Sequence, residues 1–287
     1  MRQIVPAALV TTCLLAACDG AGGDGEVGEA AAVAEGRIAL APTPPDSLPA
    51  AVLGTAPAPR GVAVHYFEED SATTGYLALP AGTGPFPGVV LVHEWDGVVD
   101  RIKQFADALA AEGYAALVAD VFSGRTGSNP DENMALVNDA LADTAALIRN
   151  LDAAAGFLRA HPAVGDRIAA IGWCFGGGIA LSYGLGGEHH AGTAIFYGRL
   201  ITDPQRLAAL DHELYGTFAG RDESIPPAEV DRFVEALRQA GIENDVHIYD
   251  DVDHGFWLYV DRDPDRFREP ARDAWQRLKA YLVRTLR

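Results

Sequence analysis

The chain carries little positive charge. Its 287 residues include 22 Lys and Arg against 40 Asp and Glu, which gives a formal net charge of -18. Such a surface repels the phosphates of nucleic acids and the headgroups of anionic lipids, so we expect neither to bind the folded domain. The apolar fraction of 49% and the aromatic fraction of 8% are typical of a globular protein with a sizeable core.

Cysteine is scarce as well, because the chain has only Cys13, Cys18 and Cys174. The first two lie in a segment where Arg2 precedes a largely apolar run, which is the pattern of an export signal and is too short for a membrane span. After cleavage before Cys18 and acylation of Cys18, Cys174 would be the only free thiol and would have no disulfide partner in the same chain. A lone thiol in an oxidising compartment has to be buried or used.

The apolar run ends on Leu15-Ala16-Ala17-Cys18, which resembles the lipobox of bacterial lipoproteins. The resemblance implies a signal peptide over residues 1–17 and acyl chains on Cys18. The protein would then be exported and anchored in the cell envelope, at the periplasmic face of the inner or outer membrane in a Gram-negative cell. An ordinary signal peptide cut nearby and a cytosolic protein with an unusual N-terminus remain alternatives.

Residues 18–60 contain no aromatic residue and are rich in Gly, Ala, Pro and Glu, a composition that predicts a flexible tether. From residue 61 to residue 287, strand and helix patterns alternate. We expect eight strands, the first two of them antiparallel, near residues 62–67, 75–79, 88–93, 114–119, 168–173, 193–197, 214–219 and 246–249. Helices are expected over residues 100–112, 131–160, 175 onward, 227–240 and 264–286, with Pro270 in the first turn of the last one. This alternation predicts an α/β fold in which helices cover both faces of a mostly parallel sheet.

The residues Gly172-Trp173-Cys174-Phe175-Gly176 join a buried strand to a helical pattern. This is the G-x-nucleophile-x-G spacing of a nucleophile elbow, with cysteine in place of serine. The glycines are needed because strand and helix pass so closely that side chains would clash there. The start of the helix also favours a thiolate. A buried structural cysteine beside a glycine-rich turn is the alternative.

A cysteine nucleophile needs a base, and the base needs an orienting acid. In an α/β-hydrolase these groups follow three strands in the chain order nucleophile, acid, base. Asp222 and His254 follow the two expected strands after the elbow, so we take them as acid and base. The alternative acids are Glu223, Asp250 and Asp253.

The backbone N–H groups of Trp95 and Phe175 would form the oxyanion hole, where the loss of one donor typically costs about 10²–10³ in rate. We expect no cofactor and no metal, because the His and Cys spacing of a structural zinc site is absent. His189 and His190 are expected in a solvated loop.

Four motifs occur together in this chain. They are Gly-Trp-Cys-Phe-Gly-Gly, His-Glu-Trp-Asp-Gly, Gly-Arg-Asp-Glu-Ser-Ile-Pro and Asp-His-Gly-Phe. In combination they resemble the dienelactone hydrolase family of α/β-hydrolases, over about residues 61–287. The resemblance implies a Cys174–His254–Asp222 triad and a covalent acyl-enzyme. It also implies that Glu94 contacts the resting thiol and helps to transfer its proton, and that Tyr197 lines the pocket. A carboxylate that only caps a strand-end loop is the alternative for Glu94.

The chain departs from the family where the substrate's carboxylate would bind. The family enzyme holds that carboxylate with two arginines, but Leu258 stands at about one of these positions and an acidic stretch at the other. Arg125 is nearby and could substitute only if its loop folds inward. We therefore expect a monomeric hydrolase of small ester, lactone or thioester substrates. A hydrolase of amides or of cell-envelope substrates, and a lipid-anchored binding or redox-sensing protein, remain alternatives.

Overall fold

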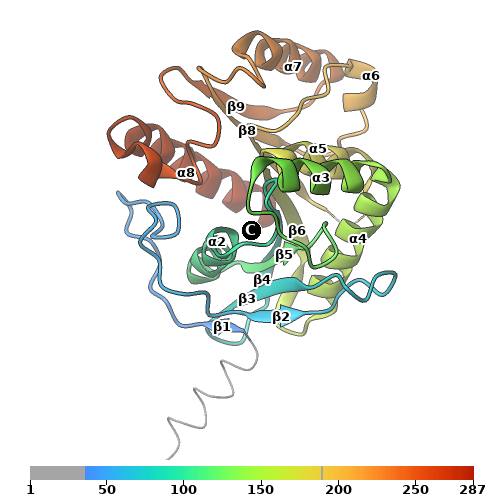
Figure 1. The fold of residues 1–287 in the computed structure, drawn as a ribbon, viewed down its shortest axis with the longest axis vertical. Coiled ribbons are helices and arrows are strands. Elements are labelled where there is room, and N and C mark those ends of the chain that lie inside the picture. The colour runs from blue at the N-terminus through green and yellow to red at the C-terminus, as the bar shows by residue number, and fades with distance from the viewer. Residues whose placement is uncertain (1–35, 189) are drawn as a thin grey trace, which may run out of the picture.

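The computed structural model describes residues 36–188 and 190–287, and a sheet of nine strands runs through it (Figure 1). The strands are β1 (Arg37–Ile38), β2 (Val62–Val64), β3 (Gly75–Pro80), β4 (Phe86–Val92), β5 (Ala115–Ala119), β6 (Val164–Trp173), β7 (Gly192–Phe196), β8 (Leu214–Ala219) and β9 (Asn244–Tyr249). Their order is β1-β3-β5-β4-β6-β7-β8-β9, and β2 pairs with β3. β3 is antiparallel to β2 and β5, and all other pairs are parallel.

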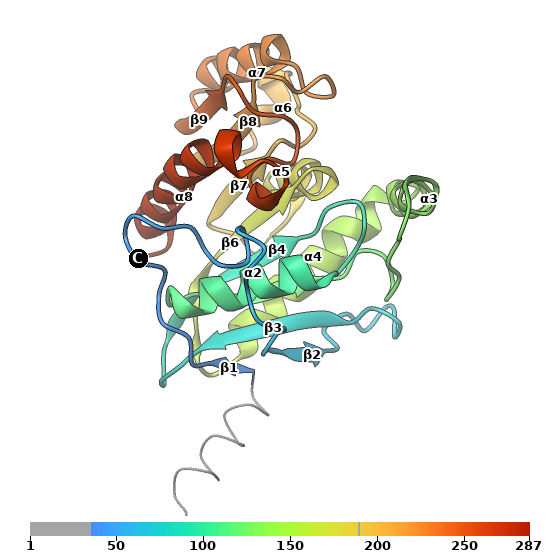
Figure 2. The same cartoon turned by 60° about the vertical axis from the view of Figure 1, so that its left-hand side comes forward.

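The predicted α/β fold with a mostly parallel sheet is confirmed, although the sheet has nine strands and not eight. Helices lie on both faces, α2 and α8 on one and α3, α4 and α5 on the other (Figures 1 and 2). The helices are α2 (Asp100–Ala111), α3 (Pro130–Leu141), α4 (Thr144–Ala160), α5 (Phe175–Gly186), α6 (Pro204–Leu207), α7 (Pro227–Ala240) and α8 (Pro264–Leu286), and η1 (Val260–Arg262) is a 3-10 turn. No helix in the described part of the chain is both long and apolar enough to cross a membrane.

The continuous apolar run of β4 is explained by burial on both faces. Val89 and Leu91 pack in the cluster that contains Trp275 of α8, whereas Val90 packs with Leu151 of α4. All five side chains are completely buried. Because burial of one such aliphatic side chain stabilises a fold by about 1.5–3 kcal/mol, the alternating sides of this strand fix its register in the sheet.

Residues 36–60 form a strap that packs against α2 and α8, so the prediction of a flexible tether over residues 18–60 is wrong for this part. Ile38, Leu48 and Val52 are buried in the same cluster as Trp275. The carbonyl of Val52 accepts a hydrogen bond from the N–H of Val260 at 3.2 Å. The strap is held because these few apolar side chains reach the core. The predicted signal peptide and Cys18 lie outside the described residues.

We predict that Val52→Ala lowers the free energy of unfolding by about 2 kcal/mol, because the Val52 side chain is fully buried beneath α2 and α8. Urea unfolding of the full chain measures this difference. Thr55→Ala, at an exposed position of the same strap, is the matched control and should change the stability by less than about 0.5 kcal/mol. Equal effects of the two substitutions would contradict the packed strap.

Candidate active site

Cys174 lies on a sharp turn between β6 and α5. Its φ is 52°, an unusual value for a residue with a side chain. A Cβ on Gly172 would come within 2.0 Å of the carbonyl oxygen of Gly176, and a Cβ on Gly176 within 2.3 Å of that of Val92. These approaches confirm the predicted steric reason for both glycines. This turn places the partly exposed thiol of Cys174 at the N-terminus of α5.

The structure brings Cys174, His254 and Asp222 together from the loops that follow β6, β9 and β8. His254 Nδ1 lies 2.6 Å from Asp222 Oδ2, and the thiol of Cys174 is close enough to the same imidazole to help raise its pKa. The alternative acids do not make this contact. Glu223 and Asp250 are exposed, and Asp253 forms an ion pair with Arg266.

Asp222 is held as a buried carboxylate. Its Oδ1 accepts hydrogen bonds from the N–H groups of Ser224 and Ile225 at 2.8 and 3.0 Å. Burial alone would raise the pKa of Asp222, but His254 and the two N–H groups outweigh it and lower that pKa. Burial likewise opposes charge on His254, yet the hydrogen bonds with Asp222 and Cys174 raise the pKa of this imidazole. These interactions therefore stabilise the Asp222 carboxylate and the imidazolium that forms when His254 takes a proton.

Glu94 lies in the loop after β4 and is almost completely buried. The Tyr197 hydroxyl is close enough to the carboxyl group to lower its pKa, and the Tyr197 ring centroid lies 4.9 Å from that of His254. Burial and the neighbouring Asp96 raise the pKa of Glu94 to about 7, although His254, Arg262 and Tyr197 partly oppose this rise. At neutral pH the carboxyl group is therefore close to half protonated and can give or take a proton.

We predict that Glu94→Gln stabilises the protein increasingly as the pH rises. A carboxyl group whose pKa is about 7 when folded and 4.5 when unfolded lowers stability between these two pH values. The stability difference between variant and wild type should therefore grow by about 3 kcal/mol from pH 4.5 to 7 and then level off. Urea unfolding across this pH range measures it, with the exposed Glu68→Gln as control. A difference that does not change with pH would contradict the buried, protonated Glu94.

The predicted oxyanion donors are the backbone N–H groups of Trp95 and Phe175. Neither N–H group has a hydrogen-bond partner within residues 36–188 and 190–287. The loop that carries Trp95 is pinned by His93, which the sequence analysis did not single out. His93 Nδ1 donates to the carbonyl of Glu94 at 2.6 Å, and its Nε2 accepts from the N–H of Val121 at 3.4 Å. The signal for His93 was its place directly after a buried strand.

The residues predicted to line the pocket have different surroundings. Tyr197 adjoins His254, and its hydroxyl accepts a hydrogen bond from the N–H of the buried Leu258. Arg125 bonds to the carbonyl of Phe122 and pairs with Asp139 of α3, so its charge is already matched.

The sequence analysis missed Arg262. The positive charge of its guanidinium favours the ionised forms of Glu94 and Asp96 and so opposes the rise in their pKa values. The guanidinium stacks on the ring of Tyr259 at 3.8 Å, and a Cβ on Gly255 would lie 3.6 Å from its Nη1. No carboxylate among the described residues lies within 4 Å of it.

Comparison with known proteins gives a consistent result. The family model described as "Dienelactone hydrolase family" matches residues 73–286. A relative from Methylorubrum extorquens named "Putative carboxymethylenebutenolidase" is 32% identical over 228 residues, which are 75% of this chain and 77% of the relative. A relative of the same name from Yersinia pestis is 29% identical over 222 residues, which are 72% of this chain and 82% of that relative. The solved structure of a "Putative Dienelactone Hydrolase" from Klebsiella pneumoniae has a TM-score of 0.66 at 24% identity, over 77% of this chain and 98% of that one.

Proposed function

The chain belongs to the dienelactone hydrolase family, and on that premise we propose that it hydrolyses ester, lactone or thioester bonds of small substrates through a covalent acyl-enzyme on Cys174. One observation carries the proposal. The imidazole of His254 hydrogen-bonds to the carboxylate of Asp222 and adjoins the thiol of Cys174, although the three residues come from separate strand ends. This is the arrangement that activates a cysteine nucleophile.

In the proposed reaction His254 takes the thiol proton, and the sulfur of Cys174 bonds to the substrate carbonyl carbon. The N–H groups of Trp95 and Phe175 stabilise the negative oxygen that forms. When the tetrahedral intermediate collapses, the bond to the leaving group breaks and His254 gives it the proton. Water then attacks the acyl-enzyme with His254 as base, which releases the acid and returns the proton to the thiol.

We propose that Glu94 assists the first proton transfer. Its pKa of about 7 and its place beside His254 suit a group that exchanges a proton when a substrate enters. The neighbouring Tyr197 hydroxyl would help to keep the carboxyl group oriented during that exchange. The alternative is that Glu94 only caps the loop after β4.

Mass spectrometry after reaction with a slowly hydrolysed ester tests the acyl-enzyme. We expect one acyl group on the peptide that contains Cys174, and its loss on longer incubation. Sulfenic acid or a mixed disulfide at Cys174, with no acyl adduct, would instead indicate a redox-sensing protein. Parallel assays with ester, thioester and amide probes distinguish an esterase from an amide hydrolase.

Arg262 suits an anionic group on the substrate, because its guanidinium lies near Gly255 and has no ion-pair partner among the described residues. We predict that Arg262→Met lowers kcat/KM about 10-fold for esters that carry a free carboxylate and leaves neutral esters unchanged. Arg268→Met, at another exposed position, is the control. Equal losses for charged and neutral esters would contradict this role.

We further propose that the protein is a monomer anchored in the cell envelope by acyl chains on Cys18. The Leu-Ala-Ala-Cys sequence at the end of the apolar run supports the anchor. Processing should be sensitive to globomycin and should leave an acylated Cys18, whereas Cys18→Ser should release the protein from the membrane fraction. A mature N-terminus elsewhere, without lipid, would contradict the anchor. Sedimentation of the solubilised protein tests the monomer.

A further inference from the structure

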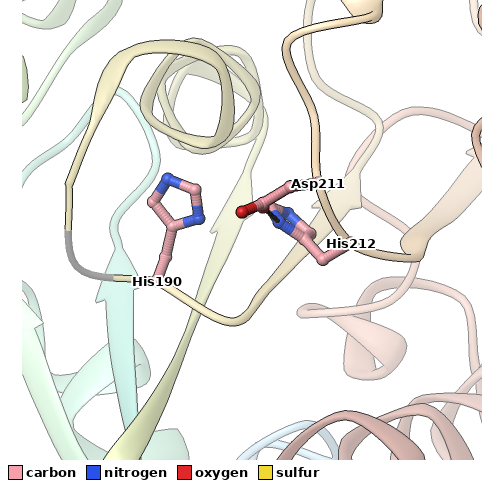
Figure 3. A group of neighbouring side chains, drawn as sticks. All are labelled: His190, Asp211 and His212. Atoms are coloured by element: carbon pink, nitrogen blue, oxygen red, sulfur yellow. Dashed lines mark hydrogen bonds and ion pairs between the residues drawn. The ribbon is translucent and has the colours of Figure 1, made fainter.

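Three side chains that take no part in the proposed hydrolysis gather at the amino ends of β7 and β8. His190 precedes β7, and Asp211 and His212 precede β8 (Figure 3). One ligand atom from each lies within 4.8 Å of the other two. The proposed triad follows the carboxyl ends of the strands, so this cluster lies at the opposite edge of the sheet.

His190 directs an unused nitrogen into the cluster. Its Nε2 lies 3.1 Å from the carbonyl oxygen of Gly187, which can only accept a hydrogen bond, so the proton is on Nε2. Its Nδ1 is buried, has no hydrogen-bond partner among the described residues and faces Asp211 and His212 (Figure 3).

His212 is oriented from both sides. Only 8% of its side chain is exposed, its Nδ1 lies 2.9 Å from Asp211 Oδ1, and its Nε2 lies 2.9 Å from Thr193 Oγ1. Without a cation, the proton on Nδ1 is shared with the carboxylate. The Thr193 hydroxyl can donate or accept, so the proton can instead occupy Nε2 and leave a lone pair on Nδ1. Metal-binding histidines are usually held in this way, with the second ring N–H bonded to a protein oxygen.

We propose that His190 Nδ1, the Asp211 carboxylate and His212 Nδ1 together bind one divalent transition-metal ion of the zinc type. Two imidazoles and one carboxylate suit Zn²⁺ and exclude Ca²⁺ and Mg²⁺ as preferred ions. Three protein ligands leave one position for water.

Donor atoms in a tetrahedral zinc site lie about 3.3 Å apart. Asp211 Oδ1 and His212 Nδ1 are already this close. His190 would have to approach by about 1.5 Å or less, because no separation exceeds 4.8 Å.

The bound ion would join the loop before β7 to the loop before β8. Because it binds the folded chain and not the unfolded one, it should stabilise the protein in proportion to its concentration. The site is separated from the triad by the length of the strands, so ester hydrolysis should not depend on it. We therefore infer a structural site and not a catalytic one.

Zinc titration of the full chain tests the proposal, in a Cys174→Ala background that removes the thiol beside His254 as a competing zinc ligand. We expect binding of Zn²⁺, and a rise in Tm of about 5 °C at a hundredfold excess over Kd. Mg²⁺ at the same concentration should have no effect. Absence of both binding and Tm shift with Zn²⁺ would overturn the proposal.

His190→Ala and Asp211→Asn should each weaken zinc binding strongly, because each removes a proposed ligand. Loss of a residue that only orients a ligand costs roughly 10–100-fold in affinity, and we expect a larger loss here. The control is His65→Ala, which removes an exposed histidine elsewhere on the domain. With Cys174 present, both variants should keep the esterase activity of the parent chain. Zinc binding as tight as that of the control in both variants would overturn the assignment of ligands.

Discussion

Replacing Cys174 with alanine is expected to abolish ester hydrolysis while the fold survives. Loss of the nucleophile in a triad costs about 10⁶ in kcat in a well-studied case, and we expect a loss of at least about 10³-fold here. The fold should survive because Cys174 is only partly buried and its backbone strain is the same for alanine. The change in the free energy of unfolding should stay below about 1 kcal/mol. Hydrolysis of an activated ester, with urea unfolding alongside, measures both quantities.

Cys174→Ser is the matched control for this experiment, because it keeps a nucleophile of similar shape at the same elbow. It should retain activity between that of the wild type and that of Cys174→Ala, since a hydroxyl is harder to deprotonate than a thiol. Undiminished hydrolysis by Cys174→Ala would refute the proposed mechanism. If the alanine variant proved unstable, acylation of the serine variant would still test the position of the nucleophile.

The second large effect is expected for Asp222→Asn, which should lower kcat by about 10⁴-fold. The asparagine oxygen can still accept from the N–H groups of Ser224 and Ile225, so the loop should keep its shape. Its amide nitrogen would then face His254 Nδ1 and donate to it. This places the imidazole proton on Nε2, on the side of Cys174, where the ring can no longer take the thiol proton.

Steady-state kinetics of Asp222→Asn across pH measure this effect. Glu223→Gln is the matched control, because Glu223 is the neighbouring carboxylate and is exposed. Asp253→Asn tests a second alternative, whose ion pair with Arg266 does not involve His254. A loss of activity in Asp253→Asn that equals the loss in Asp222→Asn would overturn the choice of acid.

Much of the candidate site could be predicted because its signals are local. The glycines around Cys174 report the close approach of β6 and α5, and this approach depends on a few consecutive residues. The order Cys174, Asp222, His254 follows from strands that end at one edge of a parallel sheet. Both features can be recognised without knowing how distant segments pack.

The expected bounds 264–286 of the last helix are those of α8, but the strap and the place of Pro270 inside α8 could not be predicted in this way. Residues 36–60 have the composition of a disordered segment, and contacts with distant elements, among them α2, α8 and β3, hold Ile38, Leu48 and Val52 in place. Pro270 was expected in the first turn of the last helix, but α8 begins at Pro264 and runs through it. Asp263 caps the start of α8 by accepting a hydrogen bond from the N–H of Arg266. The helix continues through Pro270 although proline is unfavourable inside a helix.

Arg262 and the His190–Asp211–His212 cluster were missed for a related reason. Their neighbours are close in space and belong to separate loops, so no spacing rule in the sequence identifies them. The spacing expected of a structural zinc site is a property of short local motifs. Side chains from the loops before β7 and β8 meet only once both strands have joined the sheet.

The strap determines which contacts would break first under a force applied to the N-terminal side of the chain. A pull from the amino side reaches β1 at Arg37 first, and then the segment that lies over α2 and α8. Peeling would proceed along the strap to the bond between Val52 and Val260, which belongs to the turn that carries Arg262. Strands β4 to β9, which carry the candidate active site, would bear force only after the hydrogen bond between Val52 and Val260 had broken.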